Sequence, residues 1–205
     1  MLATVFQGML ATPTGERTSD AQQLVPVTIL SGFLGSGKTT VLKRMLTGAH
    51  GVTISAIVND FGAINLDAED VEKVHEDVIE LSNGCSCCQI GADFSKSLTQ
   101  VATGETPPDH IVVEASGVSE PFSLGLLASM CPETSTAGIV TLVDAEALDA
   151  HPSLLCDDAL FRRQIEVAHL LVLTKTDRLP GERIPRLIKA LETVAPGRMV
   201  VDSSS

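Results

Sequence analysis

One short segment limits the possible folds more than any other feature of the sequence. Residues 32–39, Gly-Phe-Leu-Gly-Ser-Gly-Lys-Thr, match GxxxxGK[ST] at every fixed position, with an apolar run before them and a helical pattern after them. In that context backbone N–H groups converge on phosphate oxygens, the lysine supplies positive charge and the hydroxyl ligates Mg²⁺. We therefore predict a phosphate-binding loop whose nucleotide contacts come from Gly32, Gly35, Ser36, Gly37, Lys38, Thr39 and Thr40.

The rest of the chain fits the fold that this loop requires. Short apolar runs alternate with amphipathic stretches, and aromatic residues make up only 3% of the chain, so Val, Leu, Ile and Ala must build the core. Such alternation predicts an α/β domain of the P-loop NTPase class, with a mostly parallel sheet flanked by helices on both faces. The predicted strands are 25–30, 53–58, 78–81, 111–113, 139–143, 170–173 and 199–201.

The helical stretches and the first residues complete this outline. Val41, Leu42, Met45 and Leu46 share one helical face, as do Ile184, Leu187, Ile188 and Leu191 near the end of the chain. Residues 1–24 are rich in Thr, Gly, Ser, Gln and Ala and show no regular period, and we interpret them as a flexible N-terminal extension. Residues 25–205 form the predicted nucleotide-binding domain.

Composition excludes several classes of function. The formal net charge of −12 argues against a general nucleic-acid binder and against a polybasic membrane anchor. No apolar run approaches the roughly 20 residues of a membrane span, and the first cationic side chain is Arg17, which argues against a secretory signal. We therefore expect a cytoplasmic protein.

A carboxylate follows a later predicted strand. Residues 110–113 are largely apolar and run into Glu114, and Gly117 comes three residues later. A carboxylate here can hold the Mg²⁺ shell, and the N–H of the glycine can sense a γ-phosphate. Asp144, at the end of the 139–143 strand, is the rival candidate for the carboxylate.

The segment Thr174-Lys175-Thr176-Asp177 resembles the NKxD motif that reads guanine. The carboxylate of Asp177 can accept hydrogen bonds from guanine N1–H and the exocyclic amine, which adenine does not offer on that edge. The stem of Lys175 can lie over the base. The motif usually has Asn where this chain has Thr174, and that Asn ties the base loop to the phosphate loop, which we expect Thr to do only partly.

Three cysteines fall within four positions, in the segment Cys85-Ser86-Cys87-Cys88. Thiols on one glycine-containing loop can converge on a single ion, with Zn²⁺ the ordinary candidate and Co²⁺, Ni²⁺ or Cu⁺ as alternatives. Redox chemistry and simple packing are the competing interpretations. Asp60 could ligate Mg²⁺ or reach the thiols; Asp67, His75 and His110 are weaker candidates.

Together these segments resemble the CobW-like metallochaperone GTPases. The matching segments are 26–40, 58–67, 80–88, 114–121 and 174–177. Membership would imply a GTP-dependent handler of a transition metal, with Thr39, Asp60 and Glu114 around Mg²⁺ and Cys85, Cys87 and Cys88 as the site of the transported metal. Such proteins usually carry a further C-terminal domain, and this sequence stops after the last strand expected of the GTPase domain.

The resulting prediction is a GTPase with slow intrinsic hydrolysis, since Val118 and Ser119 follow Gly117 where some GTPases place a glutamine. Its expected partners are GTP and GDP, a transition metal, a client metalloprotein and, in one nucleotide state, a second copy of the chain. The alternative is a GTP-switched activator of a partner metalloenzyme that holds only structural metal. A nucleotide kinase is disfavoured because the chain has no Arg-rich lid segment.

Overall fold

In the computed structural model the described residues are 24–48, 51–58, 78–80 and 87–203; side chains are not described at 78–80 and 87–92. Most of the predicted N-terminal extension therefore lies outside the described residues. The strands are β1 (Val25–Gly32), β2 (Ile54–Val58), β3 (Val78–Glu80), β4 (His110–Glu114), β5 (Thr134–Asp144), β6 (Leu170–Thr174) and β7 (Met199–Asp202). The helices are α2 (Lys38–Thr47), α4 (Cys87–Ala102), α5 (Pro121–Met130), α6 (Ala145–Ala150), α7 (Leu154–Asp157), α8 (Ala159–Glu166) and α9 (Ile184–Val194), with the short 3₁₀ turns η2 (Thr176–Arg178) and η3 (Gly181–Arg183).

The seven strands form one sheet in the order β3-β2-β4-β1-β5-β6-β7, and every strand pair in it is parallel. The prediction of a mostly parallel sheet is confirmed. β1 lies between β4 and β5, so the chain order reverses beside the strand that leads into the predicted phosphate loop. In sheets of this kind ligands bind at such a switch point, outside the carboxyl ends of the strands.

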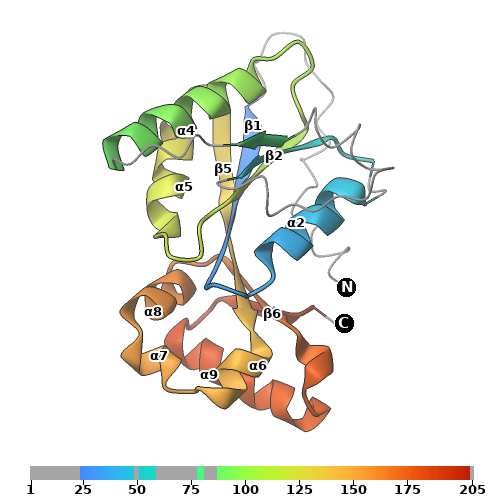
Figure 1. The fold of residues 1–205 in the computed structure, drawn as a ribbon, viewed down its shortest axis with the longest axis vertical. Helices are drawn as coiled ribbons and strands as arrows, with labels where there is room; N and C mark the ends of the chain where they lie inside the picture. The colour runs from blue at the N-terminus through green and yellow to red at the C-terminus, as the bar shows by residue number, and fades with distance from the viewer. Residues whose placement is uncertain (1–23, 49–50, 59–77, 81–86, 204–205) are drawn as a thin grey trace.

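Helices cover both faces of the sheet (Figure 1). On one face, Val41, Leu42 and Met45 of α2 pack on strand residues that include Leu30 and Val112. On the other face, α4 and α5 pack over β1 and β4, and α6, α8 and α9 pack over the β6 side. The predicted apolar faces of the first and last helices are thus both confirmed as core.

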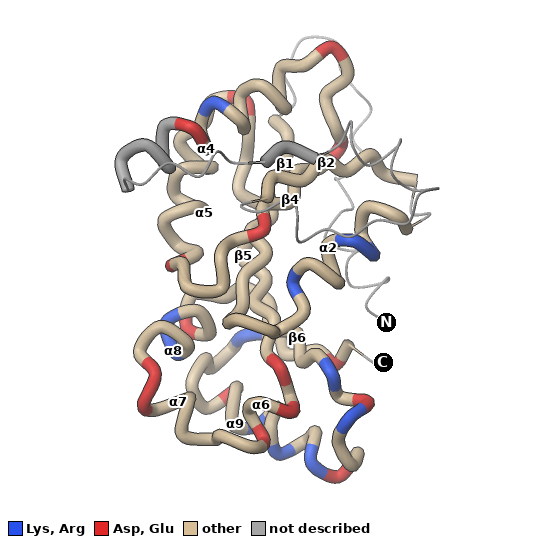
Figure 2. Tube along the Cα trace, viewed as in Figure 1, with Lys and Arg blue, Asp and Glu red and all other residues tan. Residues whose placement is uncertain are grey.

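Most charged side chains lie in the outer layers. Figure 2 shows Lys, Arg, Asp and Glu mostly on helices and connecting segments, while the strands are almost uncharged. Within the described part of the chain, no helix is long and apolar enough to cross a membrane.

Candidate nucleotide-binding site

The predicted phosphate loop connects the end of β1 to the start of α2. Gly32 is the last residue of β1, and Gly37 is the residue that caps α2. Gly37 has φ 93° and ψ 20°, a left-handed conformation that a residue with a side chain rarely adopts. The Ser36 N–H donates to Phe33 O at 3.2 Å, which tightens the loop. Lys38, Thr39 and Thr40 form the first turn of α2, where backbone N–H groups have no helical partner.

The ammonium of Lys38 lies against this loop. Its Nζ donates to Gly32 O at 2.9 Å and to Phe33 O at 3.3 Å, and the residue is only 8% exposed. Burial lowers the pKa of Lys38, and the nearby Glu114 carboxylate opposes that change. A partly desolvated cation held beside a glycine-rich loop is well suited to bind a phosphate anion.

Glu114, and not Asp144, lies beside Thr39. Thr39 Oγ1 donates to Glu114 Oε1 at 2.9 Å, although 75 residues separate them in sequence. The Asp144 carboxylate instead accepts from Ala147 N at 3.1 Å and pairs with Lys175 Nζ at 2.5 Å. A hydroxyl and a carboxylate in contact at the end of a phosphate loop form a pair of hard oxygen ligands suited to Mg²⁺.

The segment that follows Glu114 contacts the phosphate loop directly. Gly117 is buried, and a Cβ placed on it would lie 2.9 Å from Leu34 N and 2.7 Å from Leu34 Cδ2. Only a glycine permits this approach without displacing the loop. The structure therefore brings Gly117 to the phosphate loop, as the sequence spacing predicts.

Sequence reasoning missed Gln164, on α8. Gln164 is 1% exposed, and its Nε2 donates to Gly117 O at 3.2 Å and to Ser119 O at 3.0 Å. In sequence it belongs to none of the motifs identified above. Only its polarity within the buried face of an amphipathic helix could have drawn attention to it.

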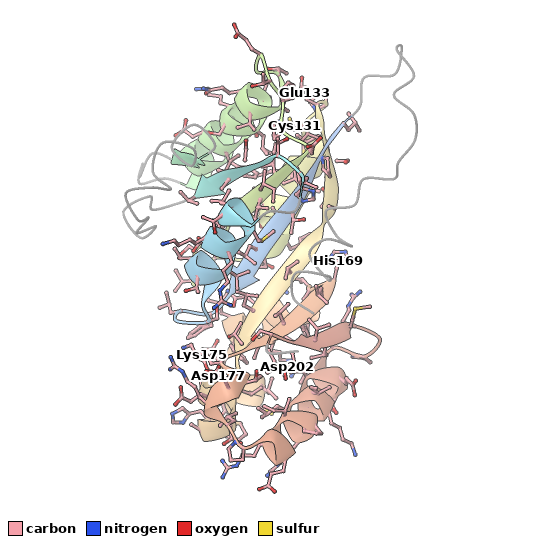
Figure 3. All side chains as sticks on the ribbon, turned by 90° about the vertical axis from the view of Figure 1, so that its right-hand side faces the viewer. Cys131, Glu133, His169, Lys175, Asp177 and Asp202 are labelled. Atoms are coloured by element: carbon pink, nitrogen blue, oxygen red, sulfur yellow. The ribbon has the colours of Figure 1, made fainter. Side chains whose placement is uncertain are left out.

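The predicted base-reading segment lies at the same edge of the sheet. Thr174 is the last residue of β6; its Oγ1 donates to Ser36 O at 2.8 Å and approaches Val143 O at 3.3 Å. Lys175 caps η2 with φ 57°, and Asp177 is exposed within that turn. Thr176 Oγ1 donates to Asp202 Oδ1 at 2.5 Å, which joins the turn to the end of β7. Figure 3 shows Lys175, Asp177 and Asp202 close together in the lower half of the molecule, far from Cys131 and Glu133 near the top.

The predicted thiol site is described only in part. Cys85, Asp60, Asp67 and His75 lie outside the described residues. Cys87 and Cys88 are the first two residues of α4, so they belong to a helix and not to the predicted loop. In the described part of the chain, no group of three His, Cys, Asp or Glu residues could hold a metal ion.

His110, a weaker candidate ligand, is not near the motif residues. It begins β4, whereas Glu114 ends it, so the two are about 13 Å apart at the usual rise of a strand. Its Nε2 lies 2.8 Å from Thr28 Oγ1, and burial lowers its pKa to about 4. His110 is therefore a neutral core residue bonded to Thr28, at the opposite end of β4 from Glu114.

One exposed apolar stripe borders the site. Phe122, Leu126 and Met130 follow one another at four-residue intervals on α5 and are 55%, 51% and 71% exposed. Val118, in the turn before α5, and Leu34, in the phosphate loop, are also exposed. Apolar side chains gathered in this way are typical of a surface that binds another protein.

Comparison with known proteins places these features in a family. The model of the CobW/HypB/UreG nucleotide-binding domain matches residues 26–202. The zinc chaperone CobW of a Sinorhizobium species is 35% identical over 185 residues, which cover 76% of this chain and 52% of that protein. The zinc-regulated GTPase metalloprotein activator 1 of Dictyostelium discoideum is 30% identical over 221 residues, covering 88% and 46% of the two chains.

The fold agrees with a solved relative. The crystal structure of the Zn(II)-bound YjiA GTPase from E. coli superposes with a TM-score of 0.60 and 26% identity, covering 87% of this chain and 57% of that one. The chain spans about half the length of the curated relatives it matches.

Proposed function

Because the chain belongs to the CobW/HypB/UreG family, we propose that it binds GTP with Mg²⁺, hydrolyses it, and uses the cycle to control a bound transition metal. The observation that carries the nucleotide assignment is the hydrogen bond from Thr174 to Ser36. It joins the phosphate loop to the segment that contains Asp177. One nucleotide can therefore reach both motifs.

The residues at the site fit a magnesium nucleotide. Thr39 and Glu114 would hold Mg²⁺, directly or through water, and Asp60 is proposed as a third member of its surround. The metal would neutralise charge on the β- and γ-phosphates. Gly32, Gly35, Ser36, Gly37 and Thr40 would contact the phosphates through the loop, and Lys38 would supply a point charge. The buried Ser36 Oγ has no hydrogen-bond partner among the described protein atoms, as expected of a group that faces a ligand.

Guanine selectivity is proposed to rest on Asp177, with Lys175 against the base. The ion pair with Asp144 and the positive φ of Lys175 fix the start of η2, and Asp177 remains open to a ligand. Only guanine offers Asp177 two donors. An adenine nucleotide would leave the carboxylate unpaired, which disfavours ATP.

Hydrolysis is proposed to be slow, well below about 1 s⁻¹, as in GTPases that lack their activators. Lys38 would stabilise the charge on the transferred phosphoryl group directly, and Glu114 would do so only through the Mg²⁺ that it helps to hold. The Gly117 N–H would contact the γ-phosphate. Val118 and Ser119 carry no side chain that could orient water as a glutamine does. A partner could supply the missing group.

The proposed cargo is Zn²⁺, with Co²⁺ or Ni²⁺ as alternatives, held by Cys85, Cys87 and Cys88. Sheet register supports communication with the nucleotide. Val58 pairs with Glu80 on one side and with Glu114 on the other, so three strands end at the same level. Glu80 and Glu114 are two strand spacings apart, about 10 Å. The segments that carry Asp60 and the thiols leave the sheet from these ends.

The proposed partner is a client metalloprotein, since a relative is named a metalloprotein activator. The proposed location is the cytoplasm, because its reducing conditions keep thiolate ligands available. The stripe formed by Phe122, Leu126 and Met130 is the proposed docking surface, because it adjoins the segment that would sense the γ-phosphate. If the stripe instead pairs two copies, sedimentation velocity with a GTP analogue will show a dimer that Leu126→Asp abolishes.

Metal titration tests the central claim. The reduced protein is titrated with Zn²⁺ in the presence of GDP and of a non-hydrolysable GTP analogue. We expect the two zinc affinities to differ by roughly 5- to 150-fold, the usual range for coupled sites. By linkage, zinc should change the ratio of analogue affinity to GDP affinity by the same factor. Ser at all three cysteine positions should abolish tight zinc binding and leave GTP binding intact. Zinc affinity that is identical in both nucleotide states would favour the alternative, an activator with structural metal only.

A further inference from the structure

Gln164 is a buried amide that no nucleotide motif accounts for. Its Nε2 reaches two backbone carbonyl oxygens, Gly117 O and Ser119 O, at 3.2 and 3.0 Å. A primary amide has two N–H donors, so both are engaged by the same short segment. Its Oε1 is buried and has no hydrogen-bond partner among the described protein atoms. Burying an unpaired oxygen destabilises the fold, so an apolar side chain of this size would serve packing better.

The helix that carries Gln164 is fixed to the sheet and to the phosphate loop. Thr141 Oγ1, on β5, donates to the backbone oxygen of Gln164 at 2.9 Å. Three residues earlier on α8, Phe161 meets Phe33 of the phosphate loop edge-to-face, with ring centroids 5.9 Å apart. α8 therefore contacts both the sheet and the phosphate loop.

The segment that Gln164 holds is the one that contains Gly117. Ser119 N donates to Ser116 O at 3.0 Å, so residues 116–119 form a turn. Arg163, next to Gln164, pairs with Glu120 at 3.0 Å on the surface. Gly117 itself lies against Leu34. The Gln164 amide therefore holds two carbonyl oxygens of this turn, one of them on the residue that contacts the phosphate loop.

We propose that Gln164 is a positioning residue that sets the orientation of Gly117 for the γ-phosphate, and so determines how well the protein distinguishes GTP from GDP. The proposal rests on the function proposed above for the Gly117 N–H. Gln164 touches neither nucleotide nor metal in this scheme; it acts through the backbone carbonyls of residues 117 and 119. GDP lacks a γ-phosphate, so its affinity should not depend on this amide.

Gln164→Met removes both donors and keeps the length of the side chain. We expect its affinity for a non-hydrolysable GTP analogue, and its kcat for GTP hydrolysis, to fall roughly tenfold or more, the effect of losing buried hydrogen bonds. GDP affinity should stay within about threefold. Thr141→Val is the matched control, because it deletes a buried bond to α8 and leaves the amide in place. That variant should lose stability but keep the analogue-to-GDP affinity ratio.

Gln164→Glu adds a second measurement, the pH dependence of the analogue-to-GDP affinity ratio, which a role in packing alone would not affect. An ionised carboxylate would repel both carbonyl oxygens, whereas the protonated acid could donate to one of them. Burial raises the pKa of such a carboxyl, so the analogue-to-GDP ratio of this variant should recover partly as pH falls from 8 to 6. The ratio of Gln164→Met should show no such recovery.

The outcomes separate the two proposals. If folded Gln164→Met and Gln164→Glu have the same analogue-to-GDP affinity ratio as the unmodified protein, the positioning of Gly117 by Gln164 is overturned. If Gly117→Ala leaves the analogue-to-GDP affinity ratio unaltered, the proposed contact between the Gly117 N–H and the γ-phosphate is overturned. If neither Gln164 variant folds, hydrogen exchange of the Gln164 side-chain amide decides the case in the unmodified protein. Slower exchange with the analogue than with GDP supports the proposal, and equal exchange overturns it.

Discussion

Thr174 donates a hydrogen bond to the backbone oxygen of Ser36 at 2.8 Å, across 138 residues of sequence. The same hydroxyl lies 3.3 Å from Val143 O, so one proton serves two acceptors. Where related motifs have asparagine, this chain ties its base segment to its phosphate loop with a single hydroxyl. Thr174 is only 6% exposed, so no water replaces the bond if it is lost.

Thr174→Val should therefore weaken the binding of every nucleotide that uses both loops. An unsatisfied buried carbonyl costs about 1–3 kcal/mol, so we expect GDP and GTP affinities to fall together by roughly 5- to 100-fold. Fluorescence titration with a labelled GDP measures the change. Thr174→Asn, which offers two donors, should retain at least the unmodified affinity.

Thr28→Val is the control for that substitution. Thr28 is also a buried strand hydroxyl, bonded to His110 at 2.8 Å, but it lies in the middle of β1, before the phosphate loop begins. It should lower stability without changing GDP affinity. Equal loss of affinity in Thr28→Val and Thr174→Val would mean that the tie between the loops has no special effect.

Base selectivity should follow the chemistry of Asp177. Asp177→Ala removes both acceptors, so the preference for GTP over ATP, which we expect to be about 100-fold or more, should largely disappear. Asp177→Asn replaces one acceptor with a donor and should shift preference toward xanthosine nucleotides, whose base carries oxygen at the 2-position. Competition of unlabelled nucleotides against labelled GDP measures both. Equal affinities for ATP and GTP in the unmodified protein would refute guanine reading.

Much of the fold could be predicted because hydrophobic periodicity reports burial. All seven predicted strands are present, and the apolar faces of α2 and α9 are core. The main error in length concerns β5, predicted to begin at residue 139 and found to begin at Thr134. Its first residues are small or polar, and they are extended because they pair with Val25–Val27 of β1 across an irregular register at Gly138. That pairing is long-range and leaves no local pattern.

The site could be predicted where a motif dictates backbone geometry, and not where one side chain reaches another across the fold. The glycines of the phosphate loop and Gly117 lie where the spacing places them. Sequence favours Glu114 over Asp144 as the magnesium carboxylate, although both residues end strands. The Thr39 contact of Glu114 and the Lys175 contact of Asp144 support that preference. Gln164 was missed because its two bonds join residues more than 40 positions apart.

Magnesium dependence distinguishes the two carboxylates functionally. Glu114→Gln keeps a hydrogen-bond acceptor for Thr39 but removes the charge. We expect it to need roughly 10- to 100-fold more Mg²⁺ for half-maximal GTP hydrolysis, the usual effect of weakening a metal's surround. GDP binding without Mg²⁺ should change little. Asp144→Asn is the matched control and should leave the Mg²⁺ requirement unchanged; a shift in that variant alone would return Asp144 to the metal site.

The pH dependence of stability should carry a contribution from His110. Burial lowers its pKa from 6.5 to about 4, so between these values the unfolded chain takes up a proton that the folded protein does not. The free energy of unfolding should therefore fall as pH is lowered through this window, by up to roughly 3 kcal/mol from this residue. Above about pH 6.5 the contribution is constant, because the imidazole is neutral in both states.

His110→Asn isolates that contribution, since asparagine fills part of the same volume and does not titrate. Its stability will be lower at pH 7.5, because a well-packed ring is lost, but its decline from pH 7 to pH 4.5 should be shallower than that of the unmodified protein. Urea unfolding at a series of pH values measures the difference between the two curves, in which the common titration of surface carboxylates largely cancels. Parallel stability curves for the two proteins would contradict this prediction. They would mean that His110 accepts a proton in the folded protein, where the Thr28 hydroxyl would then accept a hydrogen bond from the charged ring.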